Sequence, residues 1–165
     1  VWCAGSATGE EAYTLAIVLA EYYGTGFFTN GPPILATDIS LTALEKAMLG
    51  MYGEERISQI PKTMLQRYFT KSETGYTVKD EIKKMVIFKR LNFKRESFPF
   101  KKKFHTIFCR NVMIYFDQPT KETLVSKFAR HLMDGGYLFI GHSESLGRSN
   151  ADFRYVQPAV YQKNA

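Results

Sequence analysis

Length, composition and charge already exclude several classes of protein. The chain has 165 residues, 45% of them hydrophobic and 15% aromatic, which suffices for one domain with an apolar core and argues against intrinsic disorder. Its 22 basic and 16 acidic residues give a formal charge of +6. We expect a soluble protein, because we find neither an apolar run of membrane-spanning length nor a secretory leader.

Apolar periodicity alternates between short strands and helical stripes along the whole chain. The expected strands are 1–4, 34–38, 85–88, 104–109 and 137–141, and the expected helices are 12–23, 41–49, 62–68 and 120–133. We also expect a turn between two small strands over 71–78, and a terminal hairpin formed by 153–156 and 160–162. Strands that alternate with helices predict an α/β fold with a mostly parallel sheet covered on both faces.

Two further features concern the setting of the protein. Cys3 and Cys109 are the only cysteines, and two isolated thiols in apolar runs indicate a reducing, cytosolic compartment. The chain opens at Val1, inside a predicted strand, so we expect that preceding residues are missing. Between Arg56 and Lys103 there are 14 basic and 4 acidic residues, which is compatible with an anionic partner and equally with a solvated surface.

The loop after the first predicted strand, residues 5–11, carries two glycines and two acids. Gly5 and Gly9 allow the backbone to approach a ligand closely. The loop has neither the G-x-G-x-x-G nor the Walker pattern, and its adjacent carboxylates would repel a pyrophosphate, so a ligand with a cationic amine fits better than NAD. The alternative is a plain turn, with Thr8 and Glu11 forming a capping box at the helix start.

Polar residues also follow two later strands, at the edge where such sheets bind ligands. Asp38 is placed to accept the hydroxyls of a ribose, or else to stabilise the next helix start. Arg110 and Asn111 interrupt an apolar run, where a buried guanidinium needs either an anionic substrate or an internal acid. Tyr115 is by residue type more often a core aromatic than a catalytic hydroxyl. The three histidines lack metal-ligand spacing, so we expect no metal site.

Four segments together carry a distinctive set of residues: Gly5–Tyr13, Ala36–Ile39, Phe108–Asp117 and Gly141–Glu144. They resemble the CheR chemotaxis receptor methyltransferase family, and the resemblance extends over residues 1–162. The Cys-Arg-Asn-Val-Met-Ile-Tyr-Phe and Gly-His-Ser-Glu stretches are specific to that family, whereas many S-adenosylmethionine enzymes share the glycine loop and the acid.

The resemblance implies a fold for the chain. It implies a class I methyltransferase, Rossmann-like domain over residues 1–165, with a mostly parallel seven-stranded sheet, helices on both faces and a small antiparallel β-subdomain at about 67–88. Family members carry a helical domain before this one, and we expect it to be missing here. The hairpin around 72–75 is short, so docking on a receptor's C-terminal peptide is not expected.

The resemblance also implies an activity. Such an enzyme transfers a methyl group from S-adenosylmethionine to glutamate side chains of chemotaxis receptors, leaving γ-methyl esters and S-adenosylhomocysteine. The implied partners are the cytoplasmic helices of the receptors, with the basic segment helping to meet their acidic surface. We expect a cytoplasmic signal-transduction protein that neither binds nucleic acid nor inserts into membranes.

Matched residue by residue, the family pattern implies a cofactor site and two catalytic residues. Arg110 and Tyr115 are expected to face the reacting carboxylate, and Asp38 to hold the ribose. The full set of expected cofactor-binding residues is Gly5, Ser6, Thr8, Gly9, Glu10, Glu11, Asp38, Asn92, Phe93, Asn111 and Val112. Those of the glycine loop would flank the methionine part, and the last four would surround the adenine.

Two alternatives stay open on the residues alone. The positive charge is compatible with methylation of nucleic acid or another protein, although Asn111 is followed by Val112 and not by the Pro-Pro-aromatic motif of amino-methylating DNA enzymes. The second alternative is a non-catalytic module of the same fold that senses the cofactor.

Overall fold

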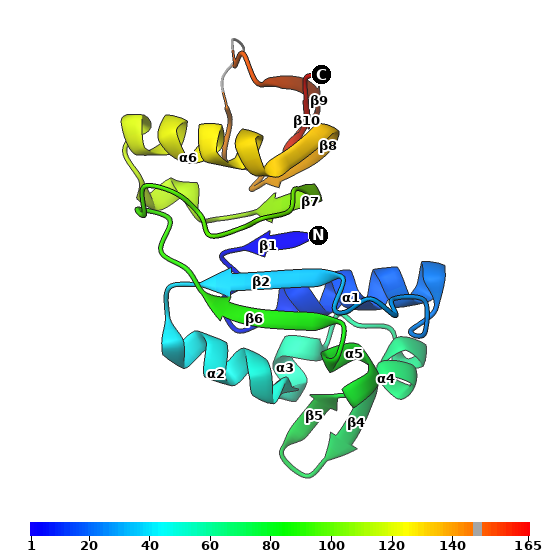
Figure 1. Cartoon of the computed structure of the whole chain (residues 1–165). Coiled ribbons are helices and arrows are strands. Elements are labelled where there is room, and N and C mark those ends of the chain that lie inside the picture. Colours follow the sequence, from blue (N-terminus) through cyan, green and yellow to red (C-terminus); the bar gives the residue numbers. More distant parts are fainter. Residues whose placement is uncertain (147–149) are drawn as a thin grey trace. The chain divides into compact units, whose positions relative to one another are not determined.

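A computed structural model of the chain describes residues 1–146 and 150–165, which form two compact units (Figure 1). The first unit comprises residues 1–5 and 91–165, and the second comprises residues 6–90. No helix among the described residues is both long and apolar enough to cross a membrane.

The first unit is built on strands that lie in the order β1-β7-β8-β10-β9. Their bounds are β1 Trp2–Ala4, β7 Phe104–Cys109, β8 Leu132–Ile140, β10 Val160–Lys163 and β9 Phe153–Gln157. The first three run parallel, and β10 pairs antiparallel with both β8 and β9. Helix α6 (Gln118–His131) packs against β8, and the 3-10 turn η1 (Met113–Tyr115) precedes it.

An aromatic cluster fills the core of this unit around Trp2, which is completely buried. Five rings lie with their centroids 4.9 to 6.2 Å from that of Trp2, namely those of Phe93, Phe98, Phe100, Phe104 and Phe128. The cluster is bordered by a buried cation, Lys127 of α6, whose Nζ donates to the carbonyl oxygens of Phe93 at 3.2 Å and Arg95 at 2.6 Å. The segment from residue 91 to 103 is therefore fixed by packing and by Lys127, without helix or strand of its own.

The second unit contains a parallel pair of strands, β2 (Ile34–Asp38) and β6 (Val86–Arg90), in register from Ile34 opposite Val86 to Asp38 opposite Arg90. Helices α1 (Glu10–Tyr23) and α2 (Leu41–Leu49) pack on this pair, and the short α5 (Asp80–Lys83) packs on α1.

A small antiparallel sheet accompanies the pair in this unit, with strand order β3-β5-β4. Its strands are β3 Met51–Tyr52, β5 Gly75–Val78 and β4 Phe69–Ser72, and the short helices α3 (Glu54–Ile57) and α4 (Lys62–Tyr68) lie between β3 and β4 in the sequence. Gly75 is needed where β5 passes β3, because its φ is +143° and any Cβ would overlap the carbonyl oxygen of Tyr52.

The expected α/β class is confirmed: seven strands, five in the first unit and two in the second, form the mostly parallel set, and the three-stranded sheet is the small antiparallel one. The largest difference in bounds is at the end of α6. The helix expected to reach residue 133 ends at His131, and β8 begins at Leu132, whereas we expected this strand to begin at residue 137, after Gly135 and Gly136. Gly136 passes so close to the carbonyl oxygen of His105 that a Cβ would lie 2.8 Å from it, which allows the strand to continue through the glycines.

Candidate functional site

In the second unit, the glycine loop folds back onto the carboxyl end of β2. The N–H of Ser6 donates to the carbonyl oxygen of Thr37, and the N–H of Ala7 donates to Oδ2 of Asp38, each at 2.9 Å. The structure thus brings the glycine loop and Asp38 into contact, although Ala7 and Asp38 lie 31 residues apart in the sequence. Gly9, with a φ of +94°, packs closely on α2, since a Cβ there would lie 2.9 Å from that of Ala47.

The carboxylate of Asp38 keeps capacity for further hydrogen bonds. Oδ2 accepts from Ala7, and Oδ1 accepts from the N–H of Ser40, also at 2.9 Å. A carboxylate offers about four acceptor positions, so each oxygen can accept one more donor, as two neighbouring hydroxyls of a ribose would require. The start of α2 is capped by Ser40, whose Oγ accepts from Ala43 at 3.2 Å, and the bond from the Ser40 N–H places Asp38 beside this helix start as well.

Ser6 supplies a direct indication of a ligand. Its side chain is only 3% exposed, and its Oγ has no hydrogen-bond partner among the described residues. A buried hydroxyl left without a partner costs about 1–3 kcal/mol. The unsatisfied Oγ and the spare acceptors of Asp38 therefore fit a ligand rich in polar groups, and an adenosyl compound with an amino-acid tail is one.

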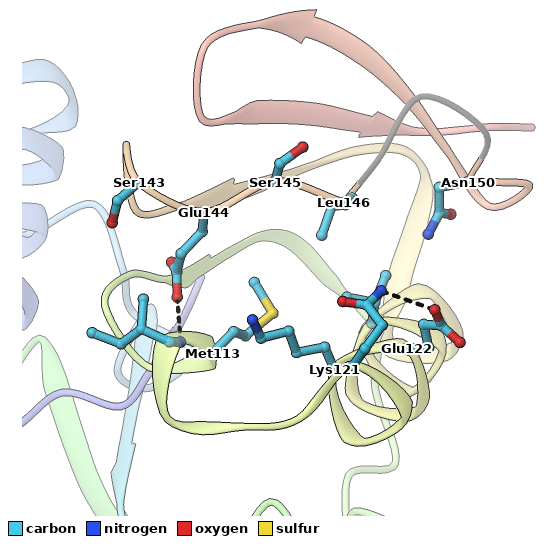
Figure 2. Close-up of a pocket in the computed structure, with 11 residues that line it drawn as sticks. Met113, Lys121, Glu122, Ser143, Glu144, Ser145, Leu146 and Asn150 are labelled. Carbon is cyan, nitrogen blue, oxygen red and sulfur yellow. Dashed lines mark hydrogen bonds between the residues drawn. The ribbon is translucent and has the colours of Figure 1, made fainter.

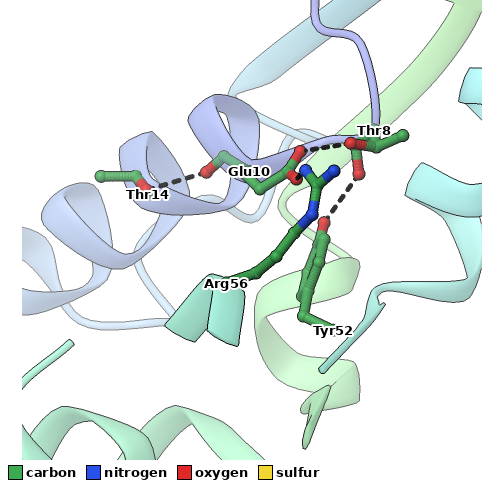
Figure 3. Close-up of polar contacts among 5 residues, drawn as sticks. All are labelled: Thr8, Glu10, Thr14, Tyr52 and Arg56. Atoms are coloured by element: carbon green, nitrogen blue, oxygen red, sulfur yellow. Dashed lines mark hydrogen bonds and ion pairs between the residues drawn. The ribbon is translucent and has the colours of Figure 1, made fainter. Parts of the chain in front are cut away.

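Glu10 is held by a polar network at the start of α1 (Figure 3). Thr8 Oγ1 donates to Oε2 of Glu10 at 2.7 Å, Arg56 pairs with Oε1, and the Tyr52 hydroxyl donates to the carbonyl oxygen of Thr8 at 2.8 Å. Burial by itself would raise the pKa of Glu10, but the bonds from Thr8, its own backbone and Arg56 together lower it. Burial raises the pKa of the Tyr52 hydroxyl, with the Glu10 charge adding to the effect.

This network replaces the alternative that Thr8 and Glu11 form a capping box. The N-cap of α1 is Gly9, with no side-chain cap, and the Thr8 hydroxyl is bonded to Glu10. The carboxylate of Glu10 is thus bonded to Thr8 and Arg56, and Glu11 lies half-buried in the same first turn.

In the first unit, Gly5 and Val112 lie in direct contact. Gly5 has a φ of +88°, and any Cβ at this position would overlap Cγ2 of Val112. Asn111 also has a left-handed backbone, with a φ of +58°. Asn92 lies in the segment 91–103, and its Oδ1 accepts from the N–H of Lys94 at 2.9 Å. The neighbouring Phe93 is half-buried against the Trp2 cluster.

The two expected catalytic residues carry exposed side chains. Arg110 follows β7 directly and is exposed, which differs from the buried guanidinium that the apolar run suggested. Tyr115 ends η1 and is 80% exposed, so it is not the core aromatic that its residue type favoured. Both residues are therefore accessible from solvent.

Glu144 is a residue whose role was not predicted, although it ends the Gly-His-Ser-Glu stretch. Its Oε2 accepts from the N–H groups of Gly141 at 2.6 Å and Asn111 at 3.2 Å, and its Oε1 accepts from the N–H of Ile114 at 3.1 Å. Figure 2 shows this side chain beside Met113. One carboxylate thereby ties the loop after β8 to the loop after β7.

A pocket of about 90 Å³ adjoins this carboxylate. Its lining comes from η1, α6 and the loop after β8, and includes Ile114, Lys121, Glu122, Ser143, Glu144 and Leu146 (Figure 2). Over residues 1–146 and 150–165, no three His, Cys, Asp or Glu side chains are grouped as metal ligands.

Comparison with known proteins gives a consistent result. Residues 1–161 match the family model described as "CheR methyltransferase, SAM binding domain". The chain is 47% identical over 165 residues to the chemotaxis protein methyltransferase of Borreliella burgdorferi, covering 99% of this chain and 58% of that protein. It is 37% identical to the chemotaxis protein methyltransferase of Escherichia coli, covering 98% and 57%. The chain thus spans somewhat more than half the length of these curated relatives.

Solved structures support the fold. The glycopeptide N-methyltransferase MtfA complexed with S-adenosyl-L-methionine superposes with a TM-score of 0.53 at 13% identity, over 93% of this chain and 48% of that one. A second crystal structure of the same enzyme gives a TM-score of 0.54 at 12% identity, over 93% of this chain and 50% of that one. At such identity the likeness establishes the methyltransferase fold and nothing finer.

Proposed function

The chain belongs to the CheR methyltransferase family, as a SAM-binding domain, and on this premise we propose that its protein methylates glutamate side chains of chemotaxis receptors. S-Adenosylmethionine is the methyl donor, and the products are glutamate γ-methyl esters and S-adenosylhomocysteine. The observation that carries the proposal is the 47% identity with a chemotaxis protein methyltransferase over 99% of this chain.

For the second unit, we propose that its residues hold the ribose and the methionine part of the cofactor. Asp38 accepts from the two ribose hydroxyls through its spare acceptor positions, and Ser6 Oγ gains the partner it lacks. Glu10 and Glu11, the two acids in the first turn of α1, are the proposed partners of the ammonium group. This assignment rests on the hydrogen-bonding capacity left over in the loop and at the end of β2.

For the first unit, we assign the adenine to Asn92, Phe93, Asn111 and Val112. The backbone at Phe93 is held by Lys127, and the backbone at Asn111 by Glu144. Such anchoring lowers the conformational entropy lost on binding, which favours affinity.

The acceptor chemistry needs orientation more than proton transfer. When bound, the cofactor supplies a methyl group already activated by its sulfonium. A glutamate carboxyl in water has a pKa of about 4.3, so near neutrality it is anionic and needs no general base. Arg110 would hold this carboxylate by charge-assisted hydrogen bonds, and the Tyr115 hydroxyl would donate to it. Correct alignment alone can be worth roughly 7–11 kcal/mol.

The partner we propose is the acidic surface of the receptor's cytoplasmic helices. The segment between Arg56 and Lys103 carries 14 basic and 4 acidic residues, and complementary charge mainly raises the rate of encounter. We place the protein in the cytoplasm with its receptors.

The test is methyl transfer by the full-length protein from radiolabelled S-adenosylmethionine. We expect label in a receptor cytoplasmic fragment, released as methanol by mild alkali as an ester requires, and none when the accepting glutamates are replaced by alanine. Label in DNA, or alkali-stable label in protein, would overturn the proposal. Tight cofactor binding without any transfer would instead favour a cofactor-sensing module.

The matched variant is Asp38→Asn, with Asp152→Asn as control, because Asp152 is exposed at the far end of the chain. Loss of one acceptor oxygen at position 38 should weaken S-adenosylhomocysteine binding at least tenfold by calorimetry, and the control should not. Unchanged affinity in Asp38→Asn would remove Asp38 from the proposed site.

A further inference from the structure

We propose that Glu144 is a positioning residue for the acceptor side of the reaction. Its carboxylate holds the backbone of residues 111–114, and in this way fixes where Arg110 and Tyr115 present their side chains. The inference rests on the proposed function for its catalytic consequence, but the hold on the backbone can be measured separately.

The Glu144 carboxylate collects backbone N–H donors from two different loops. Glu144 accepts three backbone N–H groups, one from its own loop at Gly141 and two from the loop after β7, at Asn111 and Ile114. The fit is close, since a Cβ at Gly141 would lie 2.7 Å from Oε2 of Glu144. A carboxylate with several backbone N–H partners is a strong anchor, because hydrogen bonds to an ionised acceptor are about twice as strong as neutral ones.

The two N–H groups that Glu144 binds in the loop after β7 lie next to Arg110 and Tyr115 in the sequence. The N–H of Asn111 belongs to the peptide unit that joins it to Arg110, and Ile114 directly precedes Tyr115. Between them the backbone takes a left-handed step at Asn111, with a φ of +58°, a conformation that asparagine adopts more readily than most other non-glycine residues. The bonds to Glu144 therefore hold an irregular segment that has an expected catalytic residue at each end.

Position 144 requires a carboxylate and not an amide. A carboxylate only accepts, and both its oxygens are used here. In Glu144→Gln the single amide oxygen is best placed toward Gly141 and Asn111, where it satisfies two donors, so the NH₂ group would face the N–H of Ile114. Two donors would then oppose each other, and the backbone just before Tyr115 would lose its anchor while that at Asn111 kept its own.

Because Glu144→Gln should lose the bond to Ile114 and keep the bond to Asn111, its effects on catalysis and on cofactor binding should differ. Displacement of a substrate-positioning group by about 1 Å can cost on the order of 100-fold in rate. For Glu144→Gln we expect kcat on the receptor fragment to fall 10- to 100-fold, while the dissociation constant of S-adenosylhomocysteine changes less than threefold. Amide hydrogen exchange across residues 113–115 should become faster, with that of β7 unchanged.

The matched control is Glu122→Gln. Glu122 lines the same pocket and undergoes the same change of charge, but its side chain accepts from Gln118 Nε2 at 2.8 Å within α6. We expect kcat and hydrogen exchange of this variant to stay within about twofold of the unmodified protein.

Three results would overturn the inference: an unchanged kcat in Glu144→Gln, an equal loss of kcat and cofactor affinity, or unchanged exchange at residues 113–115. If the unmodified protein transferred no methyl group to the receptor, the proposed function would fail, and the exchange measurement would still decide whether Glu144 anchors this segment.

Discussion

Replacing Lys127 by methionine tests how the segment before β7 is held in place. Lys127 is 8% exposed, and its ammonium group donates to the carbonyl oxygens of Phe93 and Arg95 while lying 5.5 Å from the centre of the Phe98 ring. Methionine keeps most of the apolar stem but supplies no donor. The change therefore removes the hydrogen bonds with little change in packing.

The expected loss of stability in Lys127→Met follows from the number of hydrogen bonds removed. A hydrogen bond to a charged group contributes about 1.5–3 kcal/mol, and we take the lower half of that range because the released carbonyls can partly rehydrate. Two such bonds give a loss of about 3 kcal/mol in the free energy of unfolding. With an m-value of about 2 kcal/mol/M for a domain of this size in urea, the midpoint should fall by about 1.5 M.

The assay is urea unfolding followed by the fluorescence of Trp2, the only tryptophan of the chain, whose ring lies in the adjoining cluster. The control is Lys121→Met, the same substitution on the same helix at a half-buried side chain that lines the pocket beside Glu144. Its midpoint should shift by less than about 0.3 M, because the change removes no buried hydrogen bond to the segment 91–103. If both variants shifted equally, Lys127 would not anchor the segment, and the argument would be wrong.

Three further predictions concern the site. Arg110→Ala should lower kcat at least 100-fold while changing cofactor affinity less than threefold, and an equal loss of both would contradict its assignment to the acceptor. Gly5→Ala should lower the melting temperature by several degrees, because the new methyl group would overlap Val112 and the left-handed backbone adds about 1–2 kcal/mol; an unchanged melting temperature would show that this contact relaxes freely. Arg56→Ala should raise the pKa of Glu10 toward its ordinary value, as measured by NMR titration. Since folding lowers this pKa, ionised Glu10 stabilises the folded protein at pH values above the usual carboxyl range, and this contribution is lost as the pH falls through the lowered pKa. The free energy of unfolding of Arg56→Ala should therefore depend less on pH in that acidic range. An unchanged titration of Glu10 in the variant would contradict the ion pair.

Elements with a full period of apolar residues could be predicted from the sequence, whereas the shortest ones could not. Helix α1 has four buried residues along one face, and strand β7 has two buried residues at alternate positions, Ile107 and Cys109. By contrast β3, α3 and α5 have two to four residues, which is too short for any periodicity to show. Their existence depends on pairing and packing with distant segments.

The candidate site, too, could be predicted only in part. Asp38 and Arg110 could be located because polar residues at the ends of apolar strands are visible locally. The hold of Glu144 on Asn111 and of Lys127 on Phe93 joins residues 33 and 34 positions apart, and no local pattern reports such a pairing. The capping box failed for a local reason: Gly9, with its φ of +94°, starts the helix at Glu10 and leaves Thr8 beside that residue.

The stretch between β6 and β7 shows how an irregular segment can be rigid in one respect and permissive in another. Its aromatic side chains are inserted around Trp2, while the side chains of residues 94–97 and 101–103 are exposed. Phe100 and Phe104, on either side of residues 101–103, both contact Trp2. A fluorescent label or a short epitope attached at 101–103 would consequently stay close to the aromatic core, making this stretch a convenient attachment point for distance measurements on the protein.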